Sequence, residues 1–172
     1  ETVQEGLKQI EQFEIIGLES QYENGVLAKA WVGELLNLPC ISVTAALNAT
    51  DKGLMRKAFQ EKSPQITPAF TVVSNEEEVK AFALEHGFPL ILKPANLAKS
   101  LLVTKSNNLE ELLTNFAYSK EKISKLYDRW GVHHRTPTLI LEEFLEGNFY
   151  SVDLIIDSKG KATAFPPVDL VM

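Results

Sequence analysis

The stretch FPLILKPANLAKSLLVTKS, residues 88–106, decides how the rest of the chain is interpreted. A short apolar run at residues 90–92 predicts a buried strand and leads directly into Lys93. A lysine is seldom buried unless it is paired, because an ammonium is costly to remove from water. At a strand end its stem can lie along apolar surface while the ammonium faces a cleft, where a phosphate would be a suitable partner. The alternative is a lysine that extends into water at a sheet edge, and spacing alone favours that alternative.

Composition places the chain among globular domains of ordinary size. Its 172 residues are 45% hydrophobic and 23% charged, which is enough for a core. No stretch approaches the roughly 18 apolar residues of a membrane span, and the N-terminus lacks the basic start and apolar middle of a secretory signal. The single cysteine, Cys40, excludes an internal disulfide and fits a reducing compartment, so we expect a cytoplasmic protein with no membrane partner.

Charge is unevenly distributed along the chain. The formal net charge of −6 argues against general nucleic-acid binding, because phosphate backbones require a basic surface. Residues 88–135 carry eight Lys or Arg against four Asp or Glu, whereas the rest carries nine against nineteen. A basic segment in an acidic chain suits a small anionic ligand, although chance clustering on a solvated helix explains it equally well.

Periodicity in the first 62 residues predicts alternating helices and strands. Helices are expected over 1–12 and 26–38, and short strands over 13–18 and 40–43, as at the end of a parallel α/β unit. Thr50 or Asp51 then caps a helix that reaches about residue 61.

The rest of the chain is predicted to contain more strands than helices. Capping boxes at 74–77 and 107–110 begin two helices, of which the first ends at Gly87. Strands are expected over 69–73, 90–94, 101–104, 138–142 and 149–157, with a turn at 157–160 and a return strand over 161–165.

Lys52 is the second unusual lysine, because it lies in the first turn of a predicted helix. Helix N-termini carry partial positive charge, so a lysine there is unfavourable by about 0.5 kcal/mol. A bound anion would reverse this effect, since the backbone amides and the lysine would bind it together. Simple neutralisation of Lys52 by Asp51 is an equally acceptable explanation.

The segment EEFLEG, residues 142–147, connects two predicted strands. An extended connector exposes backbone groups that an adenine ring can recognise, with apolar neighbours on its faces. The alternative is an ordinary acidic strand end. The adjacent His133 and His134 have no acidic or cysteine partner at ligand spacing, which indicates a loop rather than a metal site.

The order of these features resembles the ATP-grasp superfamily, above all the carboxylate–amine ligase branch that includes glycinamide ribonucleotide synthetase, biotin carboxylase and carbamoyl phosphate synthetase. The resemblance rests on TDK and its helix, ITPAFTVV, GFPLILKP, LILEEFLEG and YSVDLIIDSKG, over roughly residues 25–165. It implies an α/β chain with an α+β lid, as a piece of a longer protein. The expected parts are the end of an α/β domain (1–50), a connecting helix (51–64), the lid subdomain (65–141) and the first strands of a large antiparallel catalytic subdomain (142–172).

The resemblance also implies roles for individual residues. Lys52 matches the lysine of the family's Asp-Lys motif, and Lys93 matches the lid lysine that contacts the α- and β-phosphates of ATP. Lys99 and Ser100 are expected to add contacts to the phosphates. Adenine would be held by the backbone and first glutamate of a hinge that matches Glu142, Glu143, Phe144 and Leu145.

The implied chemistry is acyl-phosphate formation. A small carboxylate substrate attacks the γ-phosphoryl group of ATP, and an amine or similar nucleophile then displaces phosphate. Mg²⁺ is expected as a cofactor with its ligands beyond residue 172, so no metal ligand is named within the chain. A homodimer is expected by analogy, and the 172 residues alone are expected to be inactive.

Two departures from the family pattern favour an alternative function. Relatives usually have a Gly- and Ser-rich loop where this chain has PANLAKSLL, and without glycine the close approach of backbone to a phosphate is restricted. Phe149 stands where the family often has a glutamate that holds the ribose. The alternative is therefore a catalytically inactive or regulatory nucleotide-binding module.

Overall fold

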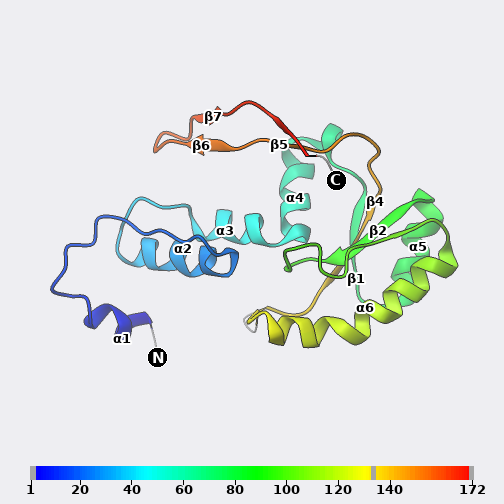
Figure 1. The fold of residues 1–172 in the computed structure, drawn as a ribbon, viewed down its shortest axis with the longest axis horizontal. Coiled ribbons are helices and arrows are strands. Elements are labelled where there is room, and N and C mark those ends of the chain that lie inside the picture. The colour runs from blue at the N-terminus through cyan, green and yellow to red at the C-terminus, as the bar shows by residue number, and fades with distance from the viewer. Residues whose placement is uncertain (1–2, 133–134, 171–172) are drawn as a thin grey trace.

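The computed structural model describes residues 3–132 and 135–170, and in them a helical N-terminal unit meets a sheet backed by helices (Figure 1). The helices are α1 (Val3–Lys8), α2 (Val26–Leu35), α3 (Val43–Thr50), α4 (Lys52–Lys62), α5 (Glu76–His86) and α6 (Leu109–Arg129), with short 3-10 turns η1 (Glu23–Gly25) and η2 (Pro64–Ile66). The strands are β1 (Phe70–Val73), β2 (Leu90–Pro94), β3 (Thr104–Ser106), β4 (Leu139–Glu143), β5 (Tyr150–Ser151), β6 (Leu154–Ile156), β7 (Ala162–Ala164) and β8 (Val168–Asp169). None of these helices is long and apolar enough to cross a membrane.

The main sheet has four antiparallel strands in the order β1-β4-β2-β3. Alternate side chains of the two central strands, including Leu90, Leu92 and Leu141, are fully buried in the core. Helices α5 and α6 cover that face through residues such as Val79 and Leu112. The opposite face carries Lys93 and Glu142 and lies toward α4. Because successive side chains of a strand point to opposite faces, the core and the candidate site lie on opposite sides of the sheet.

The helix starts follow from local capping. Asp51, Asn75 and Asn108 accept hydrogen bonds from backbone N–H groups three residues later, at the starts of α4, α5 and α6. Glu78 and Glu111 accept hydrogen bonds from the N–H groups of Ser74 and Asn107, just before the capping asparagines, so each helix start resembles a capping box. Each box begins one residue later than predicted, because the capping side chain is the asparagine.

The strands predicted over 13–18 and 40–43 are wrong. Residues 13–18 and 40–42 are irregular, Val43 begins α3, and Ile16 has 84% of its surface exposed. An apolar run becomes a strand only when another strand pairs with it, and none does so here within the described residues. Ser42 instead caps α3 by accepting a hydrogen bond from the Ala45 N–H at 3.1 Å.

The strand predicted over 101–104 is also wrong, because β3 begins only at Thr104. Leu101 and Leu102 belong to a loop and pack against the core, so their apolar character reflects burial rather than strand pairing. The strand predicted over 149–157 is divided into β5, which pairs with β8, and β6, which pairs with β7. The predicted turn between β6 and β7 is present, and Gly160 has φ 78° there.

Candidate functional site

A buried carboxylate lies between two cations on the face of the sheet opposite the core. Glu142 accepts hydrogen bonds from Arg56 Nε at 2.8 Å, from Arg56 Nη2 at 3.2 Å and from Lys93 Nζ at 2.6 Å. Only 4% of the Glu142 side chain is exposed. Burial raises the pKa of Glu142, but the hydrogen bonds from Arg56 and Lys93 outweigh burial, and the pKa is lowered overall. The carboxyl group is therefore ionised, and both of its oxygens accept hydrogen bonds.

Strand register and one helix assemble this cluster. Lys93 lies opposite Ile140 on neighbouring strands, so Glu142, two residues further along β4, is its diagonal neighbour on the same face. Arg56 comes from α4, whose first residue donates a backbone hydrogen bond from Lys52 N to Ala95 O at 2.9 Å. That bond holds the start of α4 against the end of β2, which brings Arg56 over Glu142.

Lys52 lies beside the same cluster. Its ammonium donates hydrogen bonds to the carbonyl oxygens of Leu97 at 2.7 Å and Ala95 at 3.4 Å. Burial lowers the pKa of Lys52, the charge of Glu23 partly opposes that effect, and the nearby positive charge of Lys93 lowers the pKa further. The two lysines predicted to bind phosphate are thus close enough to interact, although they are 41 residues apart in sequence. Asp51 caps α4 and accepts a hydrogen bond from Asn96, so its carboxylate has other partners than Lys52.

The loop between β2 and β3 adopts a conformation that usually requires glycine. Lys99, Ser100 and Leu102 have φ angles of 59°, 55° and 55°, in the left-handed region. The ammonium of Lys99 lies 4.7 Å from the ring centroid of Trp130, and Ser100 is exposed. The loop therefore forms its turns without glycine, and it directs Lys99 toward Trp130 rather than toward Glu142.

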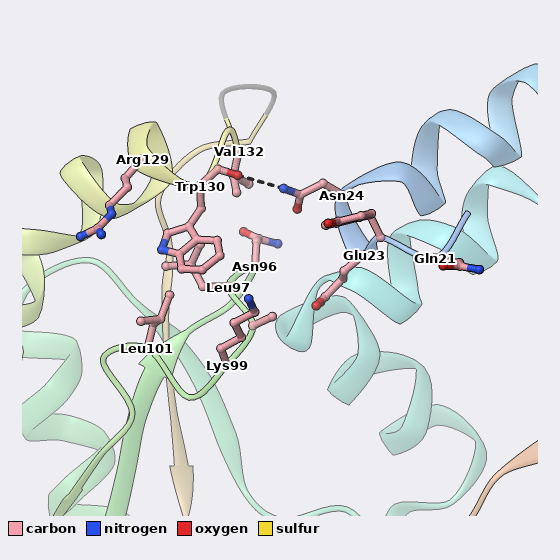
Figure 2. A pocket seen from close by; sticks show the side chains of 12 residues that line it. Gln21, Glu23, Asn24, Asn96, Leu97, Lys99, Leu101, Arg129, Trp130 and Val132 are labelled. Atoms are coloured by element: carbon pink, nitrogen blue, oxygen red, sulfur yellow. Dashed lines mark hydrogen bonds between the residues drawn. The ribbon is translucent and has the colours of Figure 1, made fainter. Parts of the chain in front are cut away.

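A pocket of about 430 Å³ lies between this loop, the end of α6 and the residues that precede α2 (Figure 2). Trp130 and Leu101 supply apolar walls, while Lys99 and Glu23 supply opposite charges. Asn24 Nδ2 donates a hydrogen bond to Trp130 O at 2.9 Å, which joins the two sides. Leu97 lines the pocket and also accepts the hydrogen bond from Lys52, so the pocket adjoins the cation cluster.

The predicted adenine hinge continues from β4. Glu143 accepts a hydrogen bond from the Ala69 N–H at 2.7 Å, and the Phe144 N–H donates to Pro89 O at 3.2 Å. The Phe144 ring lies 3.7 Å from the Lys105 ammonium, whereas Leu145 is exposed. The side chains of Glu142 and Glu143 are thus directed into the protein, and the apolar side chains of the hinge lie nearer its surface.

Arg56 and Lys105 are the charged residues of this face that sequence reasoning missed. Arg56 follows Lys52 by four residues and therefore lies one turn further along the same face of α4, which is a signal that could have been read. Lys105 lies opposite Ile91 in the strand pairing, but this register becomes visible only when β3 is placed correctly.

The described residues contain no group of three or more His, Cys, Asp or Glu side chains that could hold a metal ion. His133 and His134, which the sequence assigns to a loop, lie outside those residues. Glu142 is a carboxylate that could serve as an oxygen ligand for Mg²⁺, but Arg56 and Lys93 already neutralise it.

Comparison with known proteins finds a domain family that matches part of the chain. Residues 86–166 match the ATP-grasp domain family. The alanine–anticapsin ligase of Bacillus amyloliquefaciens is 32% identical over 149 residues, which cover 87% of this chain and 31% of that protein. The chain thus spans about a third of this relative's length.

Solved structures show the same fold. The L-amino acid ligase from Bacillus licheniformis superimposes with a TM-score of 0.71 and 18% identity, over 94% of this chain and 34% of that one. The biotin carboxylase domain of the 2-oxoglutarate carboxylase from Hydrogenobacter thermophilus gives a TM-score of 0.71 and 18% identity, over 94% and 35%. That domain was solved as a dimer with MgADP and bicarbonate. The expected fold class, a partial ATP-grasp fold with an α+β lid, is confirmed.

Proposed function

Because the chain belongs to the ATP-grasp superfamily, in its carboxylate–amine ligase branch, we propose that it is the nucleotide-binding part of an ATP-dependent ligase. The observation that carries the proposal is the convergence of Lys52, Arg56 and Lys93 at one end of the sheet, in a chain of net charge −6. Arg56 and Lys93 bond to Glu142 and Lys52 lies beside them, with Glu23 and Asp51 as the other nearby charges, so cationic donors that suit a polyphosphate gather at one place.

Within this site we assign phosphate binding first to Lys93 and Lys52, which lie together. Lys99 and Ser100 belong to the loop that would close over the phosphates, and Lys99 would have to leave the Trp130 ring to reach them. Adenine binding is assigned to Glu142, Glu143, Phe144 and Leu145. In that hinge Phe144 and Leu145 offer apolar contact, and backbone groups offer the polar contacts.

The reaction we propose is attack of a carboxylate on the γ-phosphoryl group of ATP, followed by displacement of phosphate by an amine. Mg²⁺, when bound, would neutralise charge on the phosphates. The chain's own contribution is to fix the polyphosphate through Lys52 and Lys93. The names of the relatives favour amino acids as substrates, and the pocket beside Trp130 has room for one amino acid next to the cation cluster.

A second candidate is a nucleotide-binding module without catalysis. It is favoured by the loop that directs Lys99 to Trp130, and by Phe149 at the position of the usual ribose-binding glutamate. For either function we propose a cytoplasmic location, and we propose a homodimer by analogy with the dimeric biotin carboxylase domain.

The proposal is tested by calorimetry of ADP and Mg-ATP binding to the protein at full length. Lys93→Met keeps most of the aliphatic stem and removes the charge, so we expect at least about tenfold weaker ADP binding from the loss of a charge-assisted hydrogen bond. Lys57→Met, which removes an exposed charge from the same helix as Lys52, is the matched control and should bind as the parent does.

The outcomes separate the two functions. Amino-acid-dependent release of phosphate from ATP would support the ligase. Nucleotide binding without phosphate release, over a broad set of amino acids, would favour the non-catalytic module. Absence of binding at millimolar ADP to the folded parent protein would refute both.

A further inference from the structure

The ammonium of Lys93 is already occupied in the structure, because it contacts Glu142 at 2.6 Å. A phosphate that binds Lys93 must therefore compete with a buried carboxylate. We propose that Arg56 is a positioning residue that makes this exchange possible, since it holds Glu142 while Lys93 turns to a nucleotide phosphate. The inference rests on the proposed nucleotide site and assigns no direct ligand contact to Arg56.

The hydrogen-bond geometry supports this division of roles. Arg56 contacts both oxygens of Glu142, with Nε on Oε1 and Nη2 on Oε2, whereas Lys93 contacts Oε2 alone. If Lys93 moves away, Glu142 therefore keeps a two-point partner in the planar arrangement that guanidinium and carboxylate groups favour. If Arg56 were absent, departure of Lys93 would remove the last cation bonded to Glu142.

Burial makes the difference between these two cases large. The Glu142 side chain is 4% exposed, so water cannot replace a lost cation without rearrangement of the sheet. An unpaired buried carboxylate is strongly unfavourable, and removal of one partner from a buried pair is correspondingly costly. Lys93 and Arg56 are exposed to almost the same extent, at 17% and 18%. The contact of Lys93 with a single oxygen, rather than its exposure, therefore makes it the member of the cluster that changes partners.

The ligand class that would take Lys93 from Glu142 is a nucleoside di- or triphosphate. Such a group offers several anionic oxygens, which can replace the single oxygen that Lys93 gives up. An uncharged nucleoside has no anionic oxygen that could replace the Glu142 carboxylate as the partner of the Lys93 ammonium. Arg56 thus acts on recognition of the polyphosphate, through Glu142 and Lys93.

The test measures ADP dissociation constants for the protein at full length by calorimetry. We expect Arg56→Gln to weaken ADP binding by about tenfold or more, because Lys93 is then retained by Glu142. Replacement of Glu142 as well, in Arg56→Gln/Glu142→Gln, removes the competing charge but keeps a side-chain oxygen for the adenine contact proposed above. The double variant should therefore bind ADP more tightly than Arg56→Gln. In a protein that already carries Lys93→Met, Arg56→Gln should raise the ADP dissociation constant by less than about threefold more, because its effect depends on Lys93.

Arg56→Lys is the conservative variant. It keeps a cation for Glu142 but loses the two-point contact, so we expect an affinity between those of the parent and Arg56→Gln. It also serves as the informative variant if Arg56→Gln does not fold, which thermal unfolding of each variant would reveal. In that case Arg56→Lys and Arg56→Lys/Glu142→Gln are compared in the same way.

The inference is overturned if Arg56→Gln and Lys93→Met weaken ADP binding additively, since Arg56 would then contact the phosphate itself. It is also overturned if the double variant binds no better than Arg56→Gln, or if Arg56→Gln binds as the parent does. In each of these cases the proposed function is retained if the parent protein binds ADP and Lys93→Met weakens that binding. A folded parent that does not bind ADP removes the proposed function and this inference together.

Discussion

Glu142 is the residue on which the charge balance of the site depends. It is the carboxylate bonded to both Arg56 and Lys93, and it is buried beneath them. Its pKa is below the ordinary value of 4.5, despite the opposing effect of burial. A lowered carboxyl pKa means that the ionised form is stabilised by folding, so the stabilisation is complete above about pH 4.5 and is lost as the pH falls through the lowered pKa.

We therefore predict that Glu142→Gln lowers the free energy of unfolding at neutral pH and that this difference from the parent shrinks below about pH 4.5. The parent should lose up to about 1.4 kcal/mol per pH unit from this group in that range. Denaturant unfolding from pH 7 to pH 3 measures both curves. Glu77→Gln, which removes an exposed carboxylate from α5, should follow the parent throughout. A constant difference between Glu142→Gln and the parent would contradict the prediction.

At the residue scale, Lys52 and Lys93 can be singled out from the sequence because each lies where an unpaired positive charge is unfavourable. A charge at the end of a buried strand and a cation in the first turn of a helix both need a partner. The partner of Lys93 is not predictable from local sequence, since Glu142 lies 49 residues further along the chain and only the register of β2 and β4 brings it close. Arg56 lies within a predicted helix, where an arginine is ordinary and needs no partner. Its contact with Glu142 becomes visible only when α4 is placed against the sheet.

The loop at residues 95–103 shows how an element can form without its usual residues. Three of its residues other than glycine have positive φ angles, which costs about 1 kcal/mol each relative to glycine. Leu101 and Leu102 pack against the core, so burial offsets part of this strain. The result is a turn held by apolar contacts, with Lys99 drawn to Trp130.

We predict that Ser100→Gly maintains or raises stability, by up to about 1 kcal/mol, because glycine removes the strain of the positive φ angle at that position. The control is Ser124→Gly, the same substitution at an exposed position inside α6, which should lower stability by about 0.5–1 kcal/mol. Thermal and denaturant unfolding of the two variants provide the comparison. A loss of stability at Ser100 equal to that at Ser124 would show that the loop is unstrained.

Among the elements, the starts of α4, α5 and α6 and the bounds of β1, β2 and β4 agree closely with the prediction, whereas α3 is not predicted and two predicted strands are absent from the residues that the structure describes. Helices α4, α5 and α6 begin at side chains that cap their own backbone, so a few neighbouring residues determine their starts. Strands require partners that are distant in sequence, which is why the apolar runs at 13–18 and 101–104 were wrongly assigned. The expected α/β alternation before residue 50 is absent from the described part of that segment for this reason, whereas the order of the motifs was enough to predict the ATP-grasp fold class.

In the whole molecule, the N-terminal helices and the sheet are joined by contacts that no local pattern reveals. Asn24 bonds to Trp130, Lys52 bonds to Ala95, and Arg135 donates hydrogen bonds to the backbone and side chain of Thr50. These contacts place the start of α4 at the edge of the pocket and beside the cation cluster. Lys52, Arg56 and Lys93, which are distant in sequence, are thereby gathered at one place in an acidic molecule.

This charge distribution leads to a final prediction about salt. If attraction to the cation cluster dominates, ADP binding to the protein at full length should weaken by roughly tenfold as NaCl rises from about 0.05 to about 0.5 M, because added ions screen the cations. Adenosine carries no phosphate, so its weaker binding should change by less than about twofold over the same range. Calorimetry with EDTA present keeps Mg²⁺ from altering the charge of ADP. Equal salt dependence for ADP and adenosine would show that affinity comes from the hinge. Stronger ADP binding at high salt would show that the acidic surface, rather than the lysine cluster, sets the field at the site.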